Sequence, residues 1–196
     1  MANKSPLNNR FHYHREENEL MHAGPPLDLS FKNASTCDEL VNRSIQSNRI
    51  RKLPEKTENN RFLTSSMWLS NNSLTTLSRL GDLANKFLEK PSDLRWLDLA
   101  YNKICGVDED LLKFQNLTIL YLHGNEICDI KCILKLRDLR NLRTLTLHGN
   151  PIERMPSYRR YVIAILPQIS NLDFSSVIDT EKKRALPAGF FKTISS

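Results

Sequence analysis

Residues 117–127 read LTILYLHGNEI and residues 142–152 read LRTLTLHGNPI, so leucine, asparagine and isoleucine recur at one spacing, 25 residues apart. The shared pattern is L-x-x-L-x-L-x-x-N-x-I. Its central L-x-L has period 2, which directs Leu120 and Leu122 to one face of a short strand and Tyr121 and His123 to the other. Self-similarity at a fixed period indicates repeats that stack and share one core.

Two earlier copies precede this pair. One contains Met67, Leu69 and Leu74, and the other runs from Leu94 to Ile104. Each copy has an asparagine three residues after its second apolar strand residue, where the chain turns and backbone groups lack a strand partner. We therefore predict a structural ladder of side-chain amides formed by Asn72, Asn102, Asn125 and Asn150.

The pattern is that of leucine-rich repeats. It predicts an α/β fold, a right-handed leucine-rich-repeat solenoid with a parallel β-sheet on the concave face and helices and turns on the convex face. Leucines at 74, 77, 80 and 83, followed by Phe87, predict an amphipathic helix that runs to about Lys90.

Five segments follow from the composition along the chain. We expect a disordered tail at 1–24, a covering segment and charged linker at 25–61, repeats at 62–150, a C-terminal cap at 151–178 and a basic tail at 179–196. Within 25–45, alternation after Pro25-Pro26 predicts a short edge strand, and residues 36–45 predict a short helix. In the cap, residues 158–166 predict a helix, and Ile169, Leu172 and Phe174 predict a last strand.

Side chains between the leucines line the free face of the predicted sheet. Tryptophan and tyrosine gather there, and these residues provide large contact area with few rotors to freeze. Two interpretations stay open, namely a surface for a partner protein and a cluster covered by the N-terminal segment or by packing between the indoles. We predict a protein-binding face made of Trp68, Trp96, Asp98, Ile119, Tyr121, His123, Thr146 and His148.

Metal and catalytic sites have little support in the sequence. His123 and His148 occupy equivalent places, but the neighbouring positions Ser70, Ala100 and Ser175 supply no further zinc ligand. Glycine-rich phosphate loops, zinc-protease motifs and nucleophile elbows do not occur. We expect no metal, no cofactor, no small-molecule substrate and no enzymatic activity.

Composition is that of an ordinary globular protein, with 40% hydrophobic and 26% charged residues. The net charge of +6 divides into +2 in each of the ranges 1–61, 62–178 and 179–196. This even spread disfavours a nucleic-acid surface, although basic residues from Arg49 to Arg61 and from Lys182 to Arg184 leave that reading open. We see neither a secretory signal nor a membrane span, and we expect a cytoplasmic protein.

The C-terminal motif gives a resemblance to a known group. N-P-I at 150–152 and Y-R-x-x-V-I-x-x-L-P-x-I-x-x-L-D at 158–173 resemble small cytoplasmic leucine-rich-repeat proteins with a C-terminal cap. That group includes axonemal dynein light chain 1, the A-prime protein of the U2 spliceosomal particle and regulatory subunits of protein phosphatase 1. Within it, PPLDLSF at 25–31, WLSNN at 68–72 and YLHGN at 121–125 resemble the family of leucine-rich repeat-containing protein 51.

The resemblance implies a cytoplasmic protein without catalysis, and the wider group implies a place in the cilium. Combined with the predicted face, it favours an adaptor or scaffold that binds a protein partner, with an axonemal complex as the candidate. The alternative is a component of a ribonucleoprotein particle. A membrane partner is not expected.

Overall fold

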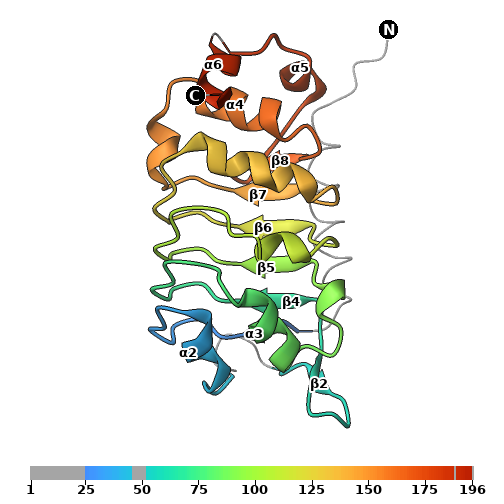
Figure 1. The fold of residues 1–196 in the computed structure, drawn as a ribbon. Helices are drawn as coiled ribbons and strands as arrows, with labels where there is room; N and C mark the ends of the chain where they lie inside the picture. Colours follow the sequence, from blue (N-terminus) through green and yellow to red (C-terminus); the bar gives the residue numbers. More distant parts are fainter. Residues whose placement is uncertain (1–24, 46–51, 188, 196) are drawn as a thin grey trace, which may run out of the picture.

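The computed structural model describes residues 25–45, 52–187 and 189–195. Successive coils of the chain stack on one another from α2 (Cys37–Val41) at one end to the C-terminal helices at the other (Figure 1). The leucines of the repeats are buried in one continuous core. The α/β leucine-rich-repeat solenoid is confirmed. The tail expected at 1–24 lies outside the described residues.

One seven-stranded sheet runs the length of the stack in the order β1-β4-β5-β6-β7-β8-β9. All neighbouring pairs are parallel except β8 and β9, which pair antiparallel. Met67, Leu97, Leu120, Leu145 and Leu172 pair in one register along β4 to β8, so the L-x-L spacing sets the sheet. The strands are β1 (Leu27–Asp28), β4 (Ser66–Trp68), β5 (Trp96–Asp98), β6 (Ile119–Tyr121), β7 (Thr144–Thr146), β8 (Asn171–Leu172) and β9 (Ser175–Ser176).

The four turn asparagines link each coil to the one before it. Asn125 Nδ2 donates to the carbonyls of Leu99 and Leu122 at 3.0 Å each, and its Oδ1 accepts the N–H of Ile104 at 3.0 Å. Asn102 and Asn150 make the equivalent bonds one coil earlier and one coil later. These amides satisfy the backbone groups that the strands leave unpaired at the turn.

The segment before the repeats forms an additional coil. Leu27 and Leu29 are buried, β1 pairs with β4, and α2 is capped by Thr36, whose side chain accepts the N–H of Glu39. Asn72 joins this coil to the ladder, because its Nδ2 donates to Leu29 O and its Oδ1 accepts the N–H of Lys32. The first repeat therefore does not end the core.

The connectors on the convex side are less helical than the leucine spacing predicts. α3 covers Leu80–Phe87 and does not include Leu74 or Leu77. The stretch from Leu74 to Leu77 is not helical, because the Asp108 carboxylate accepts the Thr76 hydroxyl at 2.9 Å and the Leu77 N–H. The other connectors are 3₁₀ helices at Pro91–Asp93, Leu111–Lys113, Ile130–Asp138 and Pro151–Arg154. No helix in the described ranges is long and apolar enough to cross a membrane.

A hairpin that the sequence prediction did not include lies before the first repeat. β2 (Glu55–Lys56), from the segment expected to be linker, pairs antiparallel with β3 (Phe62–Leu63). Phe62 is buried, and Lys56 Nζ lies 4.8 Å from the centre of its ring. Residues 46–51 of the expected linker lie outside the described residues.

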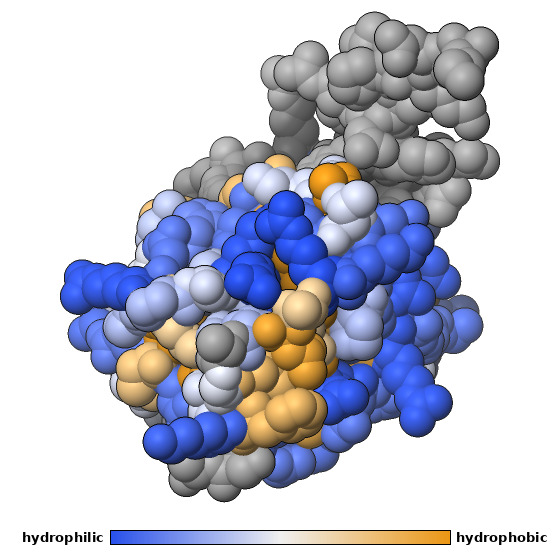
Figure 2. Space-filling model, turned by 90° about the horizontal axis from the view of Figure 1, so that it is seen from above, coloured by the Kyte–Doolittle hydropathy of each residue, from blue (hydrophilic) through white to orange (hydrophobic). Residues whose placement is uncertain are grey.

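The C-terminal end closes the core with α4 (Tyr158–Ile165), followed by α5 (Asp179–Lys182) and α6 (Phe190–Ser195). Arg159 ties this end together: it bonds Glu181 at 2.7 Å and donates to the carbonyls of Leu172 and Ser176. The Tyr161 ring stacks on Phe190 at 5.7 Å. Figure 2 looks onto this end and shows apolar side chains gathered among hydrophilic ones. Its exposed large apolar residues include Ile178, Leu186 and Phe191.

Candidate functional site

The strand register places the predicted face as the sequence spacing requires. Trp68, Asp98, Tyr121 and Thr146 pair in one row across β4 to β7. Trp96, Ile119 and Thr144 pair in the adjacent row. The two indoles and the phenol are partly buried, whereas the leucines between them are fully buried. The rings therefore lie on the side of the sheet that the core does not use.

These rings touch one another along the whole face. Trp68 and Trp96 meet edge-on with centroids 5.6 Å apart, and Trp96 meets Tyr121 in the same way at 5.8 Å. Tyr121 contacts His123 at 5.9 Å. Edge-to-face and offset pairs at these separations are the favourable arrangements for aromatic rings. We call the connected set the aromatic ladder; its members are Trp68, Trp96, Tyr101, Tyr121, His123, His148 and Phe174.

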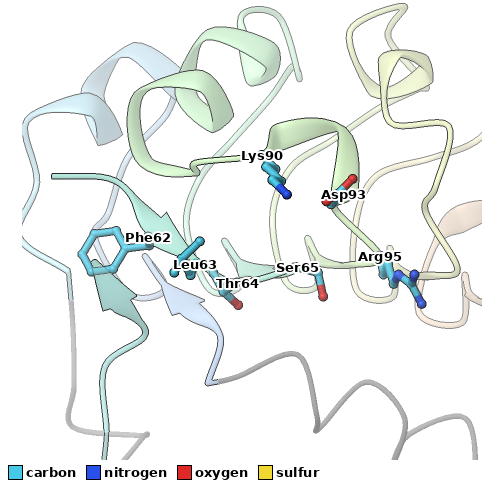
Figure 3. Close-up of a pocket in the computed structure, with 7 residues that line it drawn as sticks. All are labelled: Phe62, Leu63, Thr64, Ser65, Lys90, Asp93 and Arg95. Atoms are coloured by element: carbon cyan, nitrogen blue, oxygen red, sulfur yellow. The ribbon is translucent and has the colours of Figure 1, made fainter. Parts of the chain in front are cut away.

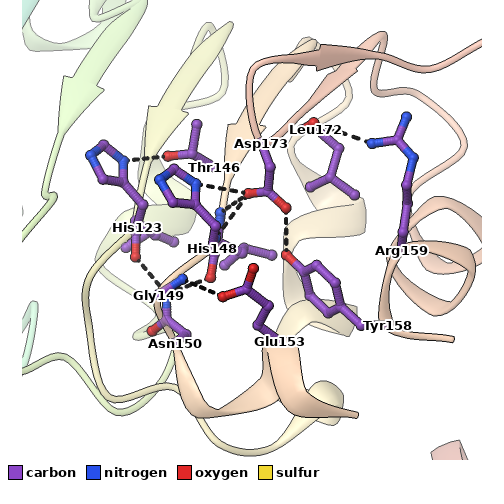
Figure 4. Close-up of polar contacts among 12 residues, drawn as sticks. His123, Thr146, His148, Gly149, Asn150, Glu153, Tyr158, Arg159, Leu172 and Asp173 are labelled. Atoms are coloured by element: carbon purple, nitrogen blue, oxygen red, sulfur yellow. Dashed lines mark hydrogen bonds and ion pairs between the residues drawn. The ribbon is translucent and has the colours of Figure 1, made fainter. Parts of the chain in front are cut away.

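Two stacked histidines continue the aromatic ladder over β6 and β7 (Figure 4). The rings of His123 and His148 lie 4.7 Å apart with an angle of 8° between their planes. His123 Nδ1 lies 2.8 Å from Thr146 Oγ1, and His148 Nδ1 lies 3.3 Å from Asp173 Oδ1. Burial lowers the pKa of His123, and the neighbouring His148 lowers it further, against an opposing effect of Asp173. The neutral form of His123 is therefore favoured.

Asp173 fixes the C-terminal end of this face. Its Oδ1 accepts the N–H groups of Leu147 at 2.6 Å and His148 at 2.9 Å, while its Oδ2 accepts the Tyr158 hydroxyl at 3.0 Å (Figure 4). Burial raises the pKa of Tyr158, and the adjacent carboxylate raises it further, so the phenol stays protonated as the donor. The Asp173 side chain, directly after β8, thus bonds both the last repeat and α4.

The prediction for Phe174 is wrong. It was expected to lie on the last strand with Ile169 and Leu172, but the chain reverses at Asp173 and Phe174, whose φ values are 52° and 58°. Two successive positive φ values are those of a type I′ hairpin turn, here between β8 and β9. The ring is 51% exposed and contacts Tyr121 at 5.5 Å. The reversal also places Ser175 in β9, so it does not lie beside His148 as the sequence spacing predicts.

Tyr101 is a second residue of the face that sequence reasoning missed. It occupies the position just before the ladder asparagine, where the later repeats have Gly124 and Gly149. All three have positive φ, of 54°, 67° and 72°. The Tyr101 ring is 57% exposed and meets His123 at 5.1 Å. An aromatic residue at a glycine position was the available signal.

Ile119 and Thr146 differ from the prediction because neither presents surface. Ile119 is 1% exposed, on a strand position between Trp96 and Thr144. Thr146 is 0% exposed, with its hydroxyl bonded to the His123 ring. Thr146 therefore holds the His123 ring, and Ile119 lies beside Trp96 in the sheet. Asp98 is partly buried and accepts the N–H of Ala100 at 3.0 Å.

The face offers ring area and a few hydrogen-bonding groups rather than reactive ones. Across residues 25–45, 52–187 and 189–195, no group of three or more His, Cys, Asp or Glu side chains is arranged to hold a metal. Burial raises the pKa of the Cys132 thiol, and it raises that of Cys37 to about 12, so both thiols stay protonated. Cys128 is exposed.

Comparison with known proteins agrees with the repeat architecture. A family model described as leucine-rich repeat matches residues 90–195. The chain is 41% identical over 161 residues to leucine-rich repeat-containing protein 51 of Macaca mulatta, which covers 82% of this chain and 83% of that protein. The proteins of the same name from Homo sapiens and Mus musculus are each 40% identical with the same coverage.

A solved structure shares the fold. The crystal structure of the Drosophila melanogaster SNF/U2A′ complex contains a chain that matches with a TM-score of 0.58 and 23% sequence identity, over 84% of this chain and 86% of that chain. At this identity the likeness shows the architecture alone. Taken with the identity and coverage of the curated relatives, the chain belongs to the leucine-rich-repeat proteins and, among them, to the family of leucine-rich repeat-containing protein 51.

Proposed function

We propose that this chain is a non-enzymatic adaptor that binds a partner protein on its concave face through the aromatic ladder. One observation carries the proposal: seven rings touch one another across the sheet on the side that the leucine core does not use. Aromatic side chains are the anchors of most protein interfaces, since each buries a large area with only two rotatable bonds.

Backbone strain at both flanks of the face supports the same reading. Phe174 and Tyr101 hold positive φ, which costs a bulky residue about 1–2 kcal/mol relative to glycine. Both rings nevertheless stay more than half exposed, at 51% and 57%. Strain of this kind clusters at functional sites, where it is retained for a reason other than stability. We take that reason to be contact with a partner.

Family membership supports the class of function. Leucine-rich-repeat proteins present extended concave surfaces for binding, and nothing in the comparisons points to catalysis. We propose the cytoplasm and the ciliary axoneme as the setting, on the likeness of residues 67–174 to the group that includes axonemal dynein light chain 1. Proximity labelling in matched ciliated and non-ciliated cells tests this setting; labelling without axonemal proteins would contradict it.

Site-specific photo-crosslinking tests the face itself. A photoreactive benzoylphenylalanine placed at Asp98 lies within the aromatic row, and one placed at Lys103 lies beyond the turn, at an exposed position. We expect a crosslinked protein from position 98 that is absent from position 103. The yield of the crosslink from position 98 should fall in a chain that also carries Trp96→Ala and Tyr121→Ala.

The matched control removes apolar surface elsewhere. Leu186→Ala with Phe191→Ala truncates side chains that are 45% and 71% exposed at the C-terminal end. This variant should crosslink from position 98 as efficiently as the wild type. A crosslink that survives Trp96→Ala and Tyr121→Ala, or that forms from position 103 alone, would remove the concave face from the proposal. A ribonucleoprotein role stays the alternative prediction, tested by RNA binding at low salt.

A further inference from the structure

A groove lies along the edge of the sheet where the strands begin, and Figure 3 shows the residues that line its first part. It consists of two hollows of about 450 Å³ and 310 Å³ that share Arg95 as a common wall. The first includes Leu63 and Lys90, and the second includes Thr118 and Arg143. We call the pair the sheet-edge groove.

The repeat register builds this edge. Arg95, Thr118 and Arg143 stand just before β5, β6 and β7, and each carbonyl accepts two N–H groups from the next coil, at 2.8–3.0 Å. Neighbouring strands lie about 4.8 Å apart, so two steps place the backbones of Arg95 and Arg143 about 10 Å apart. The two arginines therefore lie on the same edge of the sheet, before β5 and β7, with Thr118 before β6 between them.

The asparagine amide donors of the groove are already used, whereas two of its three cationic side chains are not. Asn116 and Asn141 donate to the carbonyls of Ser92 and Gln115 at 3.0 Å each. Arg95 and Lys90 are exposed, and their side chains make no hydrogen bond or ion pair with any described residue. Arg143 is different, because its Nη1 donates to the Arg140 and Leu142 carbonyls, which fixes the direction of its side chain.

The charge of the groove is complementary to an anionic ligand. Lys90, Arg95 and Arg143 face a single carboxylate among the lining residues, that of Asp93. Leu63 adds an apolar side chain that is 46% exposed. Guanidinium groups pair with carboxylates through two parallel N–H···O bonds, and a neighbouring apolar contact favours a peptide over a bare anion.

We propose that the sheet-edge groove binds an acidic, extended segment of a protein partner. An extended chain covers about 3.3 Å per residue, so roughly four residues reach from Arg95 to Arg143. Single-stranded nucleic acid fits less well, because its bases stack on exposed aromatic rings. The one ring that lines the groove, Phe62, is buried. This second site does not depend on the aromatic ladder.

Fluorescence anisotropy with the full chain tests the proposal. The probe is a labelled peptide of roughly ten residues, rich in Glu with one central Leu, which spans both hollows. Two comparison probes are used: the same peptide with Gln in place of Glu, and a single-stranded RNA. We expect the Glu peptide to bind, the Gln peptide to fail, and the affinity for the Glu peptide to fall as salt is raised.

The groove variant is Lys90→Glu with Arg95→Glu, which replaces two exposed side chains without a bond to the described fold. Its affinity for the Glu peptide should drop by about tenfold, the scale of two exposed ion pairs lost and reversed. The matched control, Lys103→Glu with Arg154→Glu, makes the same change in net charge at exposed positions near the opposite ends of the strands. It should lose less than about twofold.

Three results would overturn the proposal. They are no binding of the Glu peptide at low salt, an equal loss in the Lys103 and Arg154 control, and RNA that binds more tightly than the peptide and is lost in the groove variant. Thermal unfolding of each variant checks that folding is intact. Trp96→Ala with Tyr121→Ala should leave the Glu peptide affinity unchanged, which separates this test from that of the concave face.

Discussion

The ring of Tyr101 lies directly over Gly124: a Cβ built on Gly124 would stand 2.7 Å from Tyr101 Cδ1. Both residues occupy the same place in adjacent repeats and both have positive φ, 54° and 67°. Glycine is thus required at 124 twice over, by its backbone conformation and by the neighbouring ring. This contact positions Tyr101 against His123 at the edge of the aromatic ladder.

Gly124→Ala should destabilise the protein by about 3 kcal/mol, through left-handed backbone strain and overpacking. In a Tyr101→Asn background the overpacking disappears, and the same change should cost only about 1 kcal/mol. Urea unfolding of the four chains measures both values. Gly81→Ala is the control: it lies in α3 with only side-chain atoms beyond 3.4 Å, and it should stabilise by about 0.5–1 kcal/mol. An equal cost of Gly124→Ala in both backgrounds would contradict the ring contact.

Asn125→Ala should destabilise the protein by about 3 kcal/mol, because it leaves the buried N–H of Ile104 and two carbonyls without their partner. Asn141→Ala removes an exposed amide with a single bond to Gln115 O and should cost less than about 1 kcal/mol. Denaturant unfolding of the two variants compares the loss of stability from Asn→Ala at a buried position and at an exposed one. Similar losses would argue against the asparagine ladder as a structural element.

Phe174→Gly should separate stability from binding. Relief of about 1–2 kcal/mol of backbone strain offsets the loss of ring contacts of similar size, so the free energy of unfolding should stay within about 1 kcal/mol of the wild type. The crosslink from position 98 should nevertheless weaken. Phe31→Gly is the matched control for Phe174→Gly. Phe31 lies on the first coil and also combines a positive φ, of 58°, with a ring that is 56% exposed. Undiminished crosslinking in Phe174→Gly would exclude this ring from the interface.

Acidification should weaken the fold through His123. Its folded pKa lies below the unfolded value of about 6.5, so the unfolded chain binds the proton first as pH falls. The stability that neutral His123 contributes is present above about pH 6.5, declines through that value and levels off below the folded pKa. In His123→Gln, unfolding free energies at pH of about 7.5 and 5.5 should differ less than in the wild type. Equal differences in both chains would show that His123 is not the titrating group.

The sequence predicted the sheet well because its signal is periodic and local. Leu120 and Leu122 set a register that Leu145 and Leu147 repeat, and Asn125 marks the turn. In a core of this kind, each side chain packs only against residues of its own repeat and of the neighbouring repeats, so its position follows from the repeat spacing. Trp68, Trp96 and Tyr121 could therefore be assigned to one face from spacing alone, whereas their binding role stays a prediction.

The rest depends on contacts that no period encodes. The chain reverses at Asp173-Phe174 without the Asn-Gly pair that usually marks such a turn, so the sequence assigns Phe174 to the last strand. α3 begins only at Leu80 because the Asp108 carboxylate, 31 residues from Leu77, holds the preceding stretch in another conformation. The burial of Thr146 follows from the position of the His123 ring, which repeat spacing does not specify.

The most direct test of the proposed function is the affinity of the crosslinked partner, once it is identified, for the purified chain. With Trp96→Ala and Tyr121→Ala, titration calorimetry should show a dissociation constant at least about a hundredfold higher, since two aromatic anchors together contribute about 3 kcal/mol or more. Leu186→Ala with Phe191→Ala should leave that constant within about twofold of the wild type. A dissociation constant that both variants leave unchanged would contradict binding through the concave face.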